Sequence, residues 1–394
     1  MRYACLLSIA LVTACGRGEG ATRAAAVIDT LPGGVVRVRN TAPTGWTDSS
    51  GFRLVEDLTI TGTAGGTSEL ANPDGIAVDR RGRIYVVDGT IKLFGADGSF
   101  IRTVGRDGAG PGEYRAAMIA TAGDQLLVQD PNLARLTVFD SAGSFVRSWR
   151  TACCMIAAPS ADTAGLVTVL TSGDAPAQGS RYVRYTLDGV VRDTLELPPT
   201  TMTMWSLKTG YGGWRAVIPF TPRREVTAPP GGGLLTGWPT EYTIVLSRTG
   251  RDSARIFARS WTPPPISSAR RAAETARYRD FIIKHRQNLG GVEQSEIDRV
   301  FREGDLPPTA PAYVGLATDD AGTIWVTTDP GDDSLHTHFD LFTAEGIWLG
   351  AVRAPTRLRP YGMTAWTREA VYSIQQTTEG LPVVKRYRVV RQAK

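Results

Sequence analysis

The chain has 394 residues, of which 42% are hydrophobic, and its formal net charge is +5. A chain of this length and composition can bury a large core, which excludes a disordered protein. Its 43 glycines and 24 prolines recur at regular spacing, which predicts frequent turns.

The N-terminus carries an export signal. Arg2 precedes a short apolar run, residues 4–12, that is too short to span a bilayer, and the run ends in Val12-Thr13-Ala14-Cys15. This pattern resembles the lipobox of bacterial lipoproteins. The resemblance implies a signal peptide over residues 1–14, a lipid on Cys15, and an exported lipoprotein on an outer-membrane or periplasm-facing membrane surface of the cell envelope. The alternative is a plain secretory signal. Residues 15–32 are small and polar, which is typical of a flexible tether.

A strand repeat organises the rest of the chain. In residues 76–104, four apolar runs alternate with Asp/Gly turns, and the same unit returns in residues 118–149. The turn before the last strand recurs at five glycines, of which the first four are about 45, 46 and 61 residues apart. These are Gly98, Gly143, Gly189, Gly250 and Gly346. A four-strand unit of about 40–50 residues predicts the blades of a β-propeller.

The last unit, residues 361–390, holds only three strands before the chain ends. Residues 53–60 have strand composition and precede the first blade. Pairing them with residues 383–390 would remove an exposed sheet edge. We therefore predict an all-β fold over residues 33–394: a six-bladed propeller closed by an N-terminal strand in the last blade.

Two segments resemble NHL-repeat propellers of bacterial lipoproteins, residues 72–88 (NPDGIAVDRRGRIYVVD) and 105–120 (GRDGAGPGEYRAAMIA). The most specific residues are Asp79, Gly82 and Gly112-Glu113-Tyr114. The glycines permit a positive φ where the chain returns to the channel, and Asp79 can cap its own turn. The resemblance implies the fold rather than a function.

A helical insertion, residues 264–308, is predicted before blade five. Ser267 or Ser268 can cap a first helix, Gly290 or Gly291 can end it, and a second helix is expected over residues 293–302. The first helix is rich in cations, including Arg270, Arg271, Arg277 and Lys284. Three interpretations stay open: a structural helical pair, a docking site for an acidic partner or membrane surface, and a lid over the channel.

Candidate metal ligands are few, because the chain has three histidines. One stretch of blade five, a turn between strands, combines acidic residues with two of them: Asp329, Asp332, Asp333, His336 and His338. Oxygen and imidazole ligands at this spacing could hold Ca²⁺ or another divalent ion, although ordinary turn capping also explains the acids. No other cofactor is indicated. Lyases on NHL-like scaffolds hold zinc with histidines that this chain lacks.

The mouth of the channel is predicted from the starts of the innermost strands. Aligning these strands places six residues there: Asp74, Arg115, Cys153, Cys154, Tyr313 and Tyr361. A bond between adjacent cysteines would be strained, since ordinary disulfides need Cα atoms about 4.4–6.8 Å apart. Two free thiols, a rigid vicinal disulfide facing a ligand, and a redox pair all remain open.

These observations favour a lipid-anchored binding or scaffold module over an enzyme. The alternative is a lactonase-like hydrolase or lyase that uses a divalent metal at the channel mouth. We expect a monomer whose partner is an envelope protein or a small molecule, with the membrane reached through the lipid anchor. An exported protein meets no nucleic acid, so none is expected as a partner.

Overall fold

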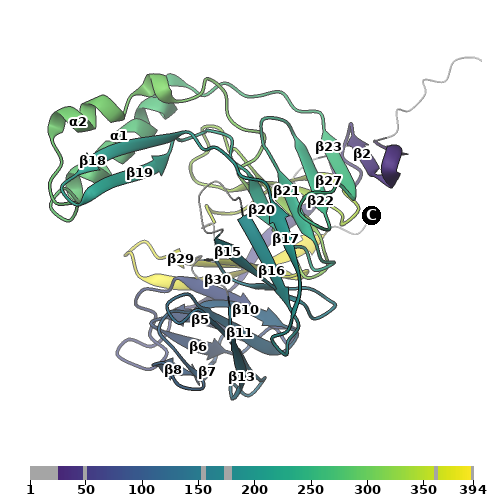
Figure 1. Cartoon of the computed structure of the whole chain (residues 1–394), viewed down its shortest axis with the longest axis vertical. Helices are drawn as coiled ribbons and strands as arrows, with labels where there is room; N and C mark the ends of the chain where they lie inside the picture. Colours follow the sequence, from purple (N-terminus) through teal and green to yellow (C-terminus); the bar gives the residue numbers. More distant parts are fainter. Residues whose placement is uncertain (1–24, 48–50, 152–156, 173–179, 359–362, 392–394) are drawn as a thin grey trace, which may run out of the picture.

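The computed structural model describes residues 25–47, 51–151, 157–172, 180–358 and 363–391 (Figure 1). Its strands form a six-bladed β-propeller with four strands in each blade, as the repeat predicts. Within the described ranges, no helix is long and apolar enough to cross a membrane.

Blades one to three follow the repeat in chain order, each as an antiparallel meander that runs from the channel outwards. Blade one contains β4 (Gly75–Val78), β5 (Ile84–Asp88), β6 (Thr90–Phe94) and β7 (Phe100–Val104). Blade two contains β10 (Met118–Ala122), β11 (Gln125–Asp130), β12 (Arg135–Phe139) and β13 (Phe145–Arg150). Blade three contains β14 (Ser160–Ala161), β15 (Val167–Ser172), β16 (Ser180–Tyr185) and β17 (Val191–Leu197).

Blades four to six complete the ring and include the N-terminal strands. Blade four contains β20 (Glu225–Thr227), β21 (Leu234–Gly237), β22 (Thr243–Ser247) and β23 (Arg255–Arg259). Blade five contains β24 (Gly315–Thr318), β25 (Ile324–Thr328), β26 (His338–Phe342) and β27 (Trp348–Arg353). Blade six contains β28 (Thr364–Trp366), β29 (Ala370–Gln376), β30 (Pro382–Arg391) and β3 (Phe52–Ile60).

The recurring turn glycines are required by the packing of one blade on the next. All five have φ between 78° and 89°, a conformation that other residues rarely adopt. A Cβ atom on Gly189 would lie 2.7 Å from the ring of Trp149, in the outermost strand of the preceding blade. A Cβ atom on Gly346 would lie 2.6 Å from Phe257, again in the preceding blade. The repeat therefore preserves both a turn and a close contact between blades.

The GPGEY segment anchors the passage from blade one to blade two. Short strands β8 (Arg106–Asp107) and β9 (Glu113–Tyr114) pair in parallel here. The buried Tyr114 hydroxyl donates to the carbonyl of Val104 and accepts from the backbone N–H of Ile91, both at 2.8 Å. Asp79 caps its own turn as predicted, since its Oδ1 accepts from the backbone N–H groups of Arg81 and Arg83.

The predicted closure of the ring is confirmed. Strand β3 pairs antiparallel with β30, from Phe52 opposite Arg391 to Ile60 opposite Val384. Ile60, Ile76 and Ile374 then pack in one buried cluster that joins blades six and one. The two ends of the chain thus share a blade, and burial of this apolar surface holds the ring closed.

An N-terminal hairpin adds two strands to the outside of blade four (Figure 1). Strand β1 (Ala26–Thr30) is joined by the short 3-10 helix η1 (Pro32–Gly34) to β2 (Val36–Asn40), which runs parallel to β23. Strand β1 lies inside the range predicted as a tether, residues 15–32, so residues 26–30 form a strand rather than a tether. Asn40 then bridges blades four and five, donating to the carbonyls of Ala258 and Gly346 at 3.0 Å.

The insertion before blade five forms a lobe with a hairpin that the sequence pattern did not reveal (Figure 1). Helices α1 (Ser268–Lys284) and α2 (Gln294–Val300) and the 3-10 helix η3 (Glu303–Asp305) pack on β18 (Met204–Thr209) and β19 (Gly212–Val217). Ser267 caps α1 as predicted. The helix ends at Lys284, before the predicted glycine stop, because the chain turns over residues 285–290. A cluster including Trp205, Ile282 and Phe301 gives this lobe its own core.

Candidate functional site

A cavity of about 420 Å³ lies where the innermost strands of blades four, five and six approach one another. Its walls come from the starts of β20, β24 and β28, the end of β25, and the turns that follow β25 and β27. We call it the blade-five cavity, because most of its lining belongs to that blade. Four ionisable residues line it: Arg223, Glu225, His336 and Arg357. Its apolar lining is formed by Val226, Val314, Leu316, Phe339, Leu358 and Trp366.

Glu225 is the most perturbed group in this cavity. It begins the innermost strand of blade four, and its side chain is 7% exposed. Burial raises the pKa of its carboxyl group to about 7, although the ion pair with Arg223 acts in the opposite direction. Arg223 Nε donates to Glu225 Oε1 at 2.9 Å. A carboxyl group that changes charge near neutral pH, in a cavity, is a candidate for ligand binding or proton transfer.

His336 belongs to a cluster centred on Asp333. The Asp333 carboxylate lies 2.7 Å from His336 Nδ1 and 2.9 Å from His338 Nε2, and it accepts from Arg353 Nε at 3.1 Å. The two histidines, His336 first, hold the pKa of Asp333 well below its usual range. Asp333 is therefore an anion that is already paired, and it orients His336 at the cavity wall.

The predicted metal site is not assembled. In the part of the chain that the structure describes, no three His, Cys, Asp or Glu side chains gather in a way that could hold a metal ion. Arg270 donates two hydrogen bonds to the Asp329 carboxylate, and the Asp332 carboxylate lies 3.4 Å from the Ser267 hydroxyl. Arginine beside two of the predicted ligands, Asp329 and Asp333, also opposes a cation electrostatically.

Arg270 fastens the lobe to blade five rather than presenting a free charge. Its guanidinium binds both oxygens of Asp329, at 3.0 and 3.1 Å, and lies 4.8 Å from the ring centre of Phe220. The corresponding acids in blades one and two act differently, since Asp88 and Asp130 accept from backbone N–H groups at the entry to their own blades. The lobe thus uses an acid that elsewhere holds the inter-blade segment.

The other predicted docking cations differ in their availability. Arg277 is bound to Glu274 within α1 and lies over Tyr278. Arg271 is partly buried, and Lys284 is exposed at the end of the helix. Ion pairs therefore already engage two of the four predicted docking residues, Arg270 and Arg277, and the docking role of the set stays a prediction.

The predicted mouth residues separate into three groups. Asp74 and Arg115 are exposed at the entries to blades one and two, and neither lines the blade-five cavity. Tyr313 cannot contact a ligand there, because its side chain is fully buried and its hydroxyl donates to the carbonyl of Thr243 at 2.8 Å. Cys153, Cys154 and Tyr361, like the predicted lipidation site Cys15, lie outside the described residues.

Among the described residues, His336 is the only one singled out from the sequence that lines the cavity. Glu225, Arg223 and Arg357 were missed. A signal for Glu225 was present, because an acidic residue occupies the position that begins the inner strand, where blades one, two and five have Gly75, Met118 and Gly315. The weak repeat in blade four concealed this alignment.

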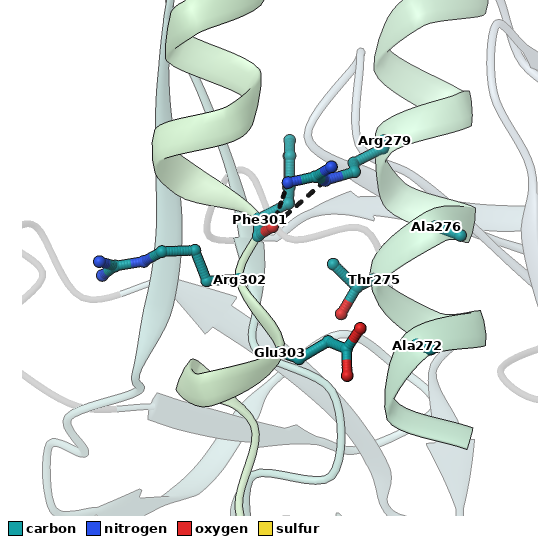
Figure 2. Close-up of a pocket in the computed structure, with 7 residues that line it drawn as sticks. All are labelled: Ala272, Thr275, Ala276, Arg279, Phe301, Arg302 and Glu303. Carbon is teal, nitrogen blue, oxygen red and sulfur yellow. Dashed lines mark hydrogen bonds between the residues drawn. The ribbon is translucent and has the colours of Figure 1, made fainter. Parts of the chain in front are cut away.

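A second hollow lies in the lobe, between α1 and the segment after α2, as Figure 2 shows. Ala272, Thr275 and Ala276 form its side on α1, and Arg279 reaches across to the carbonyl of Phe301 at 3.0 and 3.2 Å. Thr275 is buried but already donates to the carbonyl of Arg271. This hollow has no buried charged side chain, so the blade-five cavity is the stronger candidate.

No protein-family model matches the chain, and no curated protein matches it. Solved structures with similar folds include a Bacteroides fragilis protein thought to be exported, at a TM-score of 0.49 and 11% identity, covering 91% of this chain and 100% of that one. A Bacteroides vulgatus member of the DUF4221 family has a TM-score of 0.49 and 12% identity, and the match covers 88% of this chain and 100% of that one. Virginiamycin B lyase from Staphylococcus aureus has a TM-score of 0.40 and 14% identity, and the match covers 85% of this chain and 99% of that one. These similarities are too low to transfer a ligand or a reaction.

Proposed function

We propose that this protein is an exported binding module whose blade-five cavity holds a small-molecule ligand. The observation that carries the proposal is a buried, ionisable Glu225 in a cavity of about 420 Å³ with both apolar and charged walls. Small-molecule sites typically measure about 300–1,000 Å³ and combine apolar lining with a few polar groups. The walls rest on strands of three blades, which favours a preformed site with little ordering cost on binding.

The experiment that tests this proposal is a binding screen against a cavity-filling variant. Thr328 lines the cavity at the end of β25, so Thr328→Tyr should fill part of it while keeping a residue suited to a strand. The matched control is Thr103→Tyr, at an exposed position of the outer strand β7. A panel of anionic, neutral and cationic compounds is tested by thermal shift and confirmed by calorimetry.

The wild type and Thr103→Tyr should bind the same compounds, and Thr328→Tyr should lose at least tenfold in affinity. Binding that Thr328→Tyr leaves unchanged would place the ligand elsewhere. A panel with no binder to the wild type would count against the proposal.

We further propose that the chain is a lipoprotein of the NHL propeller type, anchored through Cys15. The lipobox-like Val12-Thr13-Ala14-Cys15 and the GPGEY segment support this proposal. Expression of the full chain and of Cys15→Ser in a bacterial host, followed by membrane fractionation and mass analysis of the N-terminal peptide, tests it. A lipid-modified Cys15 is expected, and an unmodified N-terminus in the membrane fraction would contradict it.

A channel-mouth hydrolase or lyase is a second candidate, favoured by one observation. A group that acts as a general acid or base works best with a pKa near the working pH, and the pKa of Glu225 is about 7. Under this candidate, wild-type protein would convert a bound compound and Glu225→Gln would bind it unchanged. Mass spectrometry of each bound compound after incubation decides the matter, because recovery of intact compounds from the wild type contradicts catalysis.

A further inference from the structure

We infer that the ligand of the blade-five cavity is a small organic carboxylate with an apolar body. This inference rests on the proposed function, since it names the class of compound that the same cavity takes. It follows from the excess positive charge among the lining residues, from the position of Arg357, and from the continuous apolar wall that blades five and six contribute.

The charges that line the cavity do not balance. Glu225 is already paired with Arg223, and Asp333, which lies behind His336 and does not itself line the cavity, is shared by His336 and Arg353. Arg357 is exposed in the cavity lining, and no ion pair of its guanidinium occurs among the described residues. Its backbone carbonyl accepts a hydrogen bond from Gln375 Nε2 at 3.3 Å. The available charge at the cavity is therefore the cation of Arg357, whose planar guanidinium matches a carboxylate in a two-bond geometry.

The state of Glu225 is compatible with an anion nearby. Because burial raises its pKa to about 7, a large fraction of the group is neutral near neutral pH. The neutral form repels a carboxylate less than the ionised form does, and it can also donate a hydrogen bond.

A cationic ligand fits less well. An amine would have to compete with Arg223 for Glu225, and the two cations would then repel each other in the same cavity. Among the described residues on the Arg357 side of the cavity, there is no acidic side chain that would pair with an amine.

The apolar wall is broad and fixed in place. The ring of Trp366 lies 4.8 Å from that of Trp325 and 5.4 Å from that of Phe339, measured between centroids. Leu316 and Leu358 extend this wall within the cavity. A flat aromatic or short aliphatic group could pack against Trp366 while its carboxylate faces Arg357, which gives the ligand one apolar and one anionic end.

Calorimetry with three compounds of similar shape tests the inference. The probes are 3-phenylpropionate, its neutral amide 3-phenylpropanamide, and the cation 3-phenylpropylamine, titrated into the wild type, Arg357→Gln and the control Arg368→Gln. Arg368 lies on blade six and does not line the cavity. We expect the carboxylate to bind at least tenfold more tightly than the amide and the amine. Arg357→Gln should remove about tenfold of that affinity and leave amide binding unchanged, while Arg368→Gln should have no effect.

The other outcomes are informative in different ways. Equal or tighter binding of the amide or the amine would overturn the carboxylate assignment while leaving a ligand site in place. The assignment would also fail if none of the three probes bound while other compounds of the wider panel did. A wild type that binds no compound of any class would overturn the proposed function itself.

Discussion

Replacing Glu225 with glutamine should stabilise the protein at high pH and leave its stability unchanged at low pH. The carboxyl group has a pKa of about 7 in the folded chain, against an ordinary value of 4.5. Between these values the folded state holds a proton that the unfolded state has lost, so the free energy of unfolding falls as the pH rises. One pKa unit corresponds to about 1.36 kcal/mol, so the full loss is about 3 kcal/mol and is complete above pH 7.

Urea unfolding at pH 4.5, 6 and 8 measures this effect. Wild type and Glu225→Gln should be equally stable at pH 4.5, and the variant should be more stable by as much as about 3 kcal/mol at pH 8. Glu241→Gln, at an exposed position, is the matched control and should track the wild type at every pH. A difference between Glu225→Gln and wild type that stays constant with pH would refute the reasoning, as would a variant that is less stable at pH 8.

Two further predictions concern the fold. Gly189→Ala should lose about 1–3 kcal/mol more stability than the control Gly380→Ala in urea unfolding, because both glycines have a positive φ but only Gly189 lies against a neighbouring blade, at Trp149. Equal losses would show that contact with the preceding blade is unimportant. Arg270→Met should loosen the lobe by about 1.5–3 kcal/mol, because it removes two hydrogen bonds to Asp329, which is 6% exposed. In Arg270→Met, hydrogen exchange of backbone amides should then become faster in α1 but not in the blades. The control Arg277→Met should leave exchange in α1 unchanged. Unchanged exchange in Arg270→Met would contradict the role of Arg270 in fastening the lobe.

The propeller could be predicted because its information is local and repeated. Each Asp/Gly turn fixes a hairpin within a few residues, and the five turn glycines mark blades one to five. The closing strand could also be predicted, because the last unit lacks one strand and the N-terminal segment supplies a strand that no other unit uses. The hairpin β18–β19 was missed because it lies outside the repeat, in the long interval between Gly189 and Gly250.

The candidate site was much harder to predict because its partners come from distant segments. Asp329, Asp332 and Asp333 with two nearby histidines resemble a ligand set when read along the chain. Arg270 and Arg353 approach them from other elements and convert the acids into ion-pair partners. Glu225 depends likewise on the folded environment: its raised pKa comes from burial, which a single sequence does not display directly.

The most direct test of the central claim is to locate the bound ligand. Hydrogen–deuterium exchange is measured with and without the tightest-binding compound of the screen, on the full chain. The account predicts slower exchange in peptides that cover the walls of the blade-five cavity, at residues 223–227, 314–317 and 364–366. Protection confined to the helical lobe or to blades one to three, with these cavity peptides unchanged, would contradict it.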